Sequence, residues 1–466
     1  MTTQASSNHT AKVIGVTVAA AVGGFLFGFD SSVINGAVDA IQGDFGLGEF
    51  LTGFTVAIAL LGCAAGAWFA GSLSDRWGRK KVMLLGSVLF VISSVGSGFA
   101  FSVPDLMLWR VIGGLGIGIA SVIAPAYIAE ISPARMRGSL ASLQQLAITI
   151  GIFAALLSDA VLANKAGGAV NELWFGLEAW RWMFLVGVIP AIVYGVLAVL
   201  IPESPRYLVG KHLDDEAAEV LANITGVEHP GERIHEIRLT LRAESRSSFA
   251  DIRGPKFGLH PLVWVGITMA VLQQFVGINA IFYYSTTLWR SVGFTEDQSF
   301  TTSVITSIIN VAMTFVAILF VDRVGRRNLL MAGSIGMFVG LMMAAVAFSQ
   351  QIGTGDDVSL PSPWGVVALI GANLFVIFFA STWGPIMWVL LGEMFPNRMR
   401  AMALGIGTAA NWIANFVISL LFPTLTETVG LSIVYGGFAF FAAVSFFFVK
   451  RNIPETKGME LEDMLD

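Results

Sequence analysis

Neutral amide side chains interrupt several long apolar stretches of this sequence. They are Gln145, Gln273, Gln274, Asn279, Asn310 and Asn411, and the tryptophans Trp388 and Trp412 lie in the same stretches. Amides donate and accept hydrogen bonds, and aromatic faces pack against C–H groups, so together they suit a ligand with several hydroxyl groups. A single amide in a span more often serves to join two helices. Six are harder to explain in that way, so we interpret them as binding groups.

The positions of these amides set limits on how they act together. Gln273 and Gln274 are adjacent, so we do not expect them to share one helix face, whereas Asn279 lies about a turn and a half beyond Gln273.

An acid and a base also lie within apolar stretches. An ionisable side chain near the centre of a bilayer costs about 2.5–3.5 kcal/mol on insertion scales, so it is a functional candidate. Asp30 and Arg110 lie in helices expected to run in opposite directions, at similar depth. We predict an ion pair in which Asp30 binds a proton and thereby weakens its hold on Arg110. The alternative is a static pair that only joins the two helices.

The composition is that of a membrane protein. Of 466 residues, 55% are hydrophobic and 13% charged, whereas soluble chains carry about 25% charged residues. The single cysteine, Cys63, excludes a disulfide framework and is expected to be a packing residue. All five histidines lie in loops or at the ends of apolar stretches, so we expect no histidine relay and no metal site. No basic cluster with interleaved aromatics indicates nucleic acid.

Glycines cluster just after Arg110. No strand is expected before them, so a dinucleotide-binding loop is excluded and close helix packing is predicted. These glycines are Gly113, Gly114, Gly116 and Gly118.

About 20 apolar residues cross the hydrocarbon layer as a helix. Twelve stretches qualify: 13–38, 50–72, 82–102, 106–129, 139–162, 181–201, 260–289, 299–320, 328–350, 364–390, 401–424 and 429–449. The even number places both termini on one side. Of the 27 Lys and Arg residues, 23 lie in segments on that side. The positive-inside rule therefore predicts cytoplasmic termini.

The two halves of the chain repeat each other. The segments 75–80 and 322–327 follow the second and eighth spans, and 130–137 and 393–400 follow the fourth and tenth. Positive-inside explains the arginines but not acids at matched positions. We predict that these charges form ion pairs between helices and act as a cytoplasmic gate. The residues are Asp75, Arg79, Glu130, Arg137, Asp322, Arg326, Glu393 and Arg400.

The segment 202–259 between the halves is the longest polar stretch. A solvated linker would explain it, but Ala217, Val220, Leu221 and Ile224 share one helical face, as do Ile234, Ile237 and Leu241. We predict short helices here, separated at Gly226 and Pro230. The domains are then 1–201 and 260–450, two six-helix halves, with the linker 202–259 and a tail 451–466.

The motifs resemble the sugar porter branch of the major facilitator superfamily over nearly the whole chain. They are 202–206 (Pro-Glu-Ser-Pro-Arg), 273–279 (Gln-Gln-Phe-Val-Gly-Ile-Asn), 384–388 (Gly-Pro-Ile-Met-Trp) and 454–458 (Pro-Glu-Thr-Lys-Gly). The segment 24–30 resembles the motif whose aspartate couples protons in bacterial symporters, whereas the related mammalian facilitative carriers have a neutral residue there. The resemblance therefore favours symport over uniport.

The resemblance also implies roles for the amides and tryptophans. Gln145, Gln273, Gln274, Asn279 and Asn310 match the family's sugar ligands in spans five, seven and eight, and Trp388 matches the tryptophan that packs against the ring. The pair Asn411-Trp412 resembles that of facilitative carriers and favours glucose over xylose. Phe27 and Tyr283 are expected as wall residues, although ordinary packing explains either of them.

We therefore expect an all-α membrane protein with twelve transmembrane helices, in two parallel six-helix halves. The expected function is import of a hexose, glucose first, together with a proton by alternating access. The alternatives are a sugar uniporter, a non-transporting sugar sensor and a drug carrier of the same fold. We expect no enzymatic activity, no cofactor and no metal, with sugar, proton and lipid bilayer as partners. The expected state is a monomer in the bacterial inner membrane.

Overall fold

The structure is a computed structural model that describes residues 2–132, 137–244, 252–255, 257–353, 358–395 and 397–455. The side chains of residues 2–8, 137–139, 141, 242–244, 322, 392–393, 397–398 and 400–401 lie outside this description.

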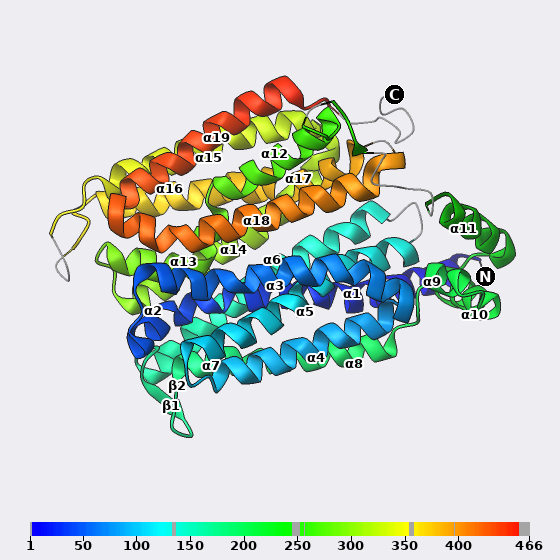
Figure 1. The fold of residues 1–466 in the computed structure, drawn as a ribbon, viewed down its shortest axis with the longest axis horizontal. Helices are drawn as coiled ribbons and strands as arrows, with labels where there is room; N and C mark the ends of the chain where they lie inside the picture. Colours follow the sequence, from blue (N-terminus) through cyan, green and yellow to red (C-terminus); the bar gives the residue numbers. More distant parts are fainter. Residues whose placement is uncertain are drawn as a thin grey trace. The chain divides into compact units, whose positions relative to one another are not determined.

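Helices make up nearly all of the described chain (Figure 1). The first half contains α1 (Thr2–Ser32), α2 (Ile34–Phe45), α3 (Glu49–Trp77), α4 (Arg79–Gly98), α5 (Val103–Ile131), α6 (Arg137–Ala166), α7 (Ala179–Val186) and α8 (Val188–Leu200). The linker contains α9 (Pro205–Gly210), α10 (Asp214–Val220), a π-helical turn (Leu221–Thr225) and α11 (Pro230–Glu244). The second half contains α12 (Pro261–Phe275), α13 (Ile278–Ser291), α14 (Glu296–Val324), α15 (Arg326–Phe348), α16 (Trp364–Phe378), a π-helical turn (Phe379–Trp383), α17 (Gly384–Glu393), α18 (Asn397–Val429) and α19 (Leu431–Asn452).

Twelve helical segments within the described residues are long and apolar enough to cross a membrane, which confirms the predicted number. Four of these spans are built from more than one helix. The first joins α1 to α2, the sixth α7 to α8, and the seventh α12 to α13, while the tenth joins α16 to α17 through the π-helical turn. Hydropathy alone predicts neither these breaks nor the short hairpin β1 (Glu172–Trp174) and β2 (Leu177–Glu178), whose antiparallel strands pair Glu172 with Glu178.

The helices group into two compact units. Unit 1 comprises residues 1–30, 61–151 and 184–247, and unit 2 comprises 31–60, 152–183 and 248–466. In unit 1, α4 packs against both α5 and α8, and in unit 2, α15 packs against both α16 and α19. The division of the chain into 1–201, 202–259, 260–450 and 451–466 follows the sequence repeat and stays a prediction.

Glycines allow the closest helix contacts in unit 1. A Cβ atom at Gly118 of α5 would collide with the carbonyl oxygen of Cys63 in α3, and one at Gly113 would collide with Ser93 of α4. The predicted role of this glycine cluster in helix packing is therefore confirmed for these two positions. Cys63 itself is buried, as expected for a packing residue.

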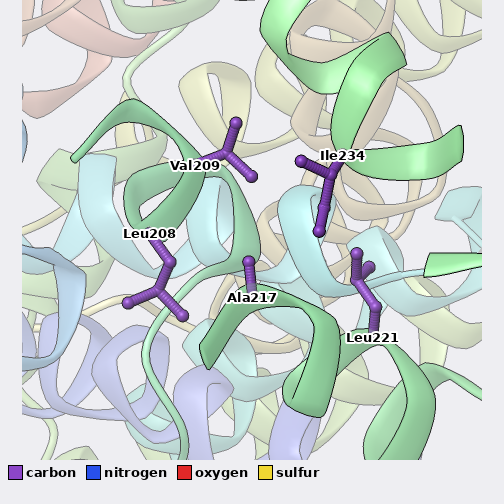
Figure 2. Packing of buried hydrophobic residues seen from close by; sticks show 5 residues of the cluster. All are labelled: Leu208, Val209, Ala217, Leu221 and Ile234. Carbon is purple, nitrogen blue, oxygen red and sulfur yellow. The ribbon is translucent and has the colours of Figure 1, made fainter. Parts of the chain in front are cut away.

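The predicted short helices in the linker form a small core of their own. Figure 2 shows the side chains that meet there: Leu208, Val209, Ala217, Leu221 and Ile234. The first helical piece ends at Gly226, whose φ of 70° is left-handed, and α11 begins at Pro230, as the sequence predicts. The start of α1 is tied to this group, because the Lys12 ammonium donates to the carbonyl of Asn223 (3.1 Å).

Candidate functional site

The break in the seventh span creates the centre of the candidate site in unit 2. The helix α12 ends at Phe275 and α13 begins at Ile278, with Gly277 between them at a φ of 87°. A Cβ atom at Gly277 would collide with the ring of Phe438, so both conformation and space require glycine here. The break places Gln273 and Gln274 in the last turn of one helix and Asn279 in the first turn of the next.

Four of the predicted amides form one hydrogen-bonded network. Asn279 donates to Gln274 Oε1 (2.6 Å), and Gln274 donates to Asn411 Oδ1 (3.1 Å). Asn411 in turn donates to Gln273 Oε1 (2.8 Å) and to the carbonyl of Ala270 (3.1 Å). The network therefore joins α12, α13 and α18.

Gln273 and Gln274 are adjacent on α12, yet their side chains belong to the same network. Adjacent positions on a helix point about 100° apart. Nevertheless, Asn411 reaches both side chains from α18, and Gln274 also donates directly to Gln273 Oε1 (3.4 Å). A residue from a second helix, α18, thus joins two side chains that α12 directs apart.

The tenth span anchors this network. The Gln273 amide donates to the carbonyls of Trp383 (3.0 Å) and Gly384 (3.2 Å). These carbonyls lie where the π-helical turn passes into α17. The π-helical turn of the tenth span therefore supplies acceptors that fix the orientation of Gln273.

The network keeps hydrogen-bonding capacity for a ligand. Among the described hydrogen bonds, Asn279 uses one N–H, which leaves its carbonyl oxygen and second N–H for another partner. Asn279 is only partly buried, whereas Gln273, Gln274 and Asn411 are buried. We therefore interpret Asn279 as the ligand-facing end of a pre-oriented amide group.

The other residues predicted for unit 2 lie on neighbouring helices. Asn310 is buried on α14, Trp388 lies on α17 and is 36% exposed, and Trp412 is buried on α18 next to Asn411. Tyr283 is buried on α13. Their participation in ligand binding stays a prediction.

Two amides in these helices were missed by the sequence reasoning. Asn415 lies one turn after Asn411 on α18 and donates to the Tyr283 hydroxyl (3.4 Å). The spacing of four residues from Asn411 was the signal that would have found it. Gln144 of α6 in unit 1 is buried against Gly24 of α1, whereas the predicted Gln145 is only partly buried.

Two of the predicted site residues belong to unit 1. Gln145 on α6 and Phe27 on α1 are half-buried. Their place beside the network of unit 2 stays a prediction.

Asp30 and Arg110 do form an ion pair, as predicted. Arg110 Nη1 lies 3.5 Å from Asp30 Oδ2 and donates to the Asp30 backbone carbonyl (3.3 Å). Arg110 is 2% exposed and Asp30 is 6% exposed, and the guanidinium lies 5.8 Å from the Phe184 ring centroid. The pair is incompletely hydrogen-bonded, because Asp30 Oδ2 and Arg110 Nε have no hydrogen-bond partner among the described residues. The two side chains therefore attract each other without the short, paired hydrogen bonds of an ideal arginine–carboxylate ion pair.

A denser charge cluster lies where α4 begins and α5 ends. Arg79 donates to both carboxylate oxygens of Glu130 (2.8 and 3.0 Å) and also to Asp75 (3.2 Å). The fork-shaped pair with Glu130 is the strong geometry for arginine and carboxylate. Arg206 and Ser204 of the linker also contact Glu130. The predicted contacts among Asp75, Arg79 and Glu130 are therefore present within unit 1.

The second half contains a partial counterpart. Arg326 Nη1 donates to the carbonyl of Val321 (3.3 Å), five residues earlier, as Arg79 Nη1 does to Ser74 (3.2 Å). The remaining predicted gate side chains lie outside the described residues: Arg137, Asp322, Glu393 and Arg400.

Two glutamates complete this repeat, and the sequence reasoning did not assign them a role. Glu203 accepts the backbone N–H groups of Arg79 (3.0 Å) and Lys80 (3.3 Å), and so caps the start of α4. Glu455 accepts those of Arg326 (2.9 Å) and Arg327 (3.2 Å) at the start of α15. Carboxylates at helix N-termini satisfy unpaired N–H groups and favour the helix dipole. The signal was the matched Pro-Glu pair after the last span of each half.

A glycine stands directly before each of the two capped helix starts, and both its conformation and the space around it require glycine. Gly78 and Gly325 have left-handed φ values of 93° and 97°, and a Cβ atom at either would collide with the capping glutamate. The two halves therefore share backbone conformation, cap and space requirement at this turn.

Comparisons with known proteins agree with this geometry. The model of the family described as "Sugar (and other) transporter" matches residues 16–465. A glucose transport protein of Synechocystis sp. is 52% identical over 460 residues, which is 98% of each chain. A D-xylose-proton symporter of Escherichia coli is 34% identical over 496 residues, covering 100% of this chain and 96% of the relative.

A solved structure gives the same result for the fold. The xylose transporter XylE from E. coli, in a partially occluded inward open conformation, superposes with a TM-score of 0.84 at 32% identity. The match covers 97% of this chain and 100% of the other.

Proposed function

Because this chain belongs to the sugar transporter family of the major facilitator superfamily, we propose that it imports a hexose, glucose first, together with a proton. One observation carries the proposal: a network of four amides is assembled at the break of the seventh span and anchored to the π-helical turn of the tenth. Broken helices at membrane depth are tolerated where they line a cavity or are buried in protein.

The amides support a sugar as the ligand. Each hydroxyl of a hexose donates and accepts, and Asn279 offers both an oxygen and an N–H. Trp388, partly exposed on α17, provides an aromatic face for the C–H side of the ring. Glucose is the first choice because the relative that is 52% identical is called a glucose transport protein. Gln145, Asn310, Trp412, Tyr283 and Phe27 complete the proposed site.

Asp30 and Arg110 support the coupling to a proton. In its ionised form Asp30 attracts the buried guanidinium, and in its protonated form that attraction is lost. Because the pair is incompletely hydrogen-bonded, the release of Arg110 on protonation breaks few other contacts. The relatives named as proton symporters for xylose and arabinose agree with this coupling. Protonation then permits the helices that carry the pair, α1 and α5, to rearrange.

We place both termini in the cytoplasm and the protein in the inner membrane as a monomer. The distribution of Lys and Arg supports this orientation, since 23 of 27 lie in segments on that side. The contacts of Arg79 with Glu130 and Asp75 then lie at the cytoplasmic ends of α4 and α5. We assign these contacts, and the matched charges around Arg326, to a cytoplasmic gate that forms and breaks during transport.

The deciding experiment is uptake of labelled glucose by purified protein in liposomes, with an inward proton gradient and an inside-negative potential. Accumulation above the external concentration, which collapses when a protonophore is added, would support both glucose and proton coupling. Entry that stops at equilibrium would indicate a uniporter, and absence of entry would contradict glucose as the substrate.

A further inference from the structure

A second acid in the membrane spans has no role in the proposed coupling. Asp159 of α6 is 0% exposed and lies within the span Ser142–Ala166. Its Oδ2 accepts the backbone N–H of Gly36 (3.3 Å), and its Oδ1 is buried without a hydrogen-bond partner among the described residues. None of the ion pairs between described side chains includes it.

The contact between Asp159 and α2 is close and specific. A Cβ atom at Gly36 would lie 2.7 Å from Asp159 Cβ and Oδ2, so glycine is required for the carboxyl group to reach the helix backbone. Gly36 lies in the first turn of α2. The carboxyl group is therefore enclosed, and the first turn of α2 covers the side that its Oδ2 faces.

The same turn of α2 is also bound to α13. Asn35, 0% exposed, donates to the carbonyl of Phe282 (2.8 Å) and accepts from the N–H (3.1 Å) and hydroxyl (2.8 Å) of Thr286. One turn later, Asp39 accepts from Thr287 and Arg290 (2.7 Å each). Thus α2 is held by α13 through Asn35 and by α6 through Gly36, and both contacts belong to unit 2.

The charged groups on the surrounding elements are engaged elsewhere. On α13, Arg290 pairs with Asp39 of α2. On α6, the next charged residue after Asp159 is Lys165, whose ammonium lies 4.7 Å from the centroid of a tryptophan ring. At the start of α7, Arg181 pairs with a neighbouring glutamate (2.7 Å). The negative charge of an ionised Asp159 would therefore stay uncompensated.

We propose that Asp159 is a second proton-binding site, which holds a proton while α2 packs on α6 and α13 and releases it when α2 moves away. An ionised carboxylate enclosed without a cation or water is much less stable than the neutral acid. Proton loss therefore favours separation of α2 from α6. In the orientation proposed above this end of the spans faces outward, so external acidity stabilises the closed packing.

This site differs in role from Asp30. Asp159 belongs to the other compact unit, and its proton returns to the side from which it came when α2 moves. The site controls access rather than carrying a coupled proton. The inference needs neither glucose as the substrate nor coupling through Asp30, so it can fail or hold independently of the proposed function.

The test measures how far α2 opens as a function of pH. A reporter cysteine replaces Ala40, which is 1% exposed and lies one turn beyond Gly36, in an Asp30→Asn, Cys63→Ala background. The rate of labelling by a membrane-impermeant maleimide is measured from about pH 5.5 to about pH 8. Each rate is divided by the rate for denatured protein at the same pH, which removes the effect of the thiol's own titration. With Asp159 present, the corrected rate should rise by up to about tenfold per pH unit, the limit for linkage to one proton.

The decisive variant is Asp159→Asn, which keeps the shape of the side chain and removes its titration. Its corrected labelling should change less than about twofold over the same range, because no linked proton remains. The matched control is Asp105→Asn, an acid whose oxygens accept from Phe101 and Trp109 near the start of α5, and it should keep the full pH dependence. An unchanged pH dependence in Asp159→Asn, or none in the parent protein, would overturn the proposal.

A second measurement does not depend on labelling. The infrared spectrum of the Asp30→Asn protein at neutral pH should contain the carbonyl band of a neutral carboxylic acid. That band should disappear in the Asp30→Asn, Asp159→Asn double variant. A spectrum without the band while Asp159 is present would contradict the assignment.

Discussion

Replacing Asp30 by asparagine tests the proposed coupling most directly. The change removes the titratable group but keeps an oxygen near Arg110, and the contact of Arg110 with the backbone carbonyl of residue 30 remains. Removing one partner of a buried ion pair costs about 3–5 kcal/mol. Because these two acceptors remain, we expect the cost in stability at the lower end, about 3 kcal/mol.

The effect on transport is set by thermodynamics rather than by affinity. One proton that moves down a potential of about 100 mV supplies about 2.3 kcal/mol, which supports roughly fifty-fold accumulation of sugar. In liposomes with this potential and no pH gradient, the parent protein should approach that ratio. Asp30→Asn should reach a ratio of about 1, because sugar movement no longer carries charge. Exchange of labelled for unlabelled sugar, which needs no net proton movement, should continue.

The control and the refuting result follow from the same measurement. Asp159→Asn removes another buried acid but, in our proposal, no coupled proton, so it should keep the full accumulation ratio. If Asp30→Asn still concentrated sugar many-fold and a protonophore abolished this, the coupled proton would bind elsewhere. The Asp30–Arg110 pair would then be structural.

Three further predictions concern the amide network, the helix break and the caps. Asn411→Ala removes three hydrogen bonds and leaves buried amides unpaired, so we expect the sugar Kd to rise about 10- to 100-fold, measured by tryptophan fluorescence titration. Gly277→Ala should destabilise the protein by about 2–4 kcal/mol in thermal unfolding in detergent, because alanine is strained at this left-handed φ and its Cβ atom collides with Phe438. The control Gly436→Ala should have little effect, because the space around Gly436 is open. Glu203→Gln weakens two charge-assisted hydrogen bonds to the start of α4 and should lower the unfolding temperature, and Glu455→Gln should do the same for α15; equal stability of either variant would contradict the capping role.

The sequence predicts the span pattern well because hydropathy and length report directly on the cost of placing residues in a bilayer. The pairing of Asp30 with Arg110 could also be predicted, since each charge needs compensation at its depth. The break at Gly277 is a different kind of feature, because one residue with a left-handed φ does not alter the average hydropathy of a span. The hydrogen bonds that join Gln273 to Gln274 through Asn411 were also not predicted, because they depend on where α18 places Asn411.

Some contacts depend on residues that are far apart in sequence. The matched Pro-Glu pair marks Glu203 as a repeated position, but it does not indicate that the partner is the start of α4, which lies in a different span. The enclosure of Asp159 depends on the packing of α2, which the sequence of its own span does not indicate. Patterns within one helix and the need of a buried charge for a partner were predictable, whereas contacts that depend on how distant segments pack were not.

The two capping glutamates have a consequence for how the protein is made. Glu203 lies 124 residues after Arg79, and Glu455 lies 129 residues after Arg326, in each case beyond the final span of its half. During synthesis, the turn between the second and third spans therefore stays uncapped until the sixth span has left the ribosome. The same delay recurs in the second half, with the twelfth span. A chain that stops before either glutamate therefore leaves the helix start in that half without the acceptor of two backbone N–H groups.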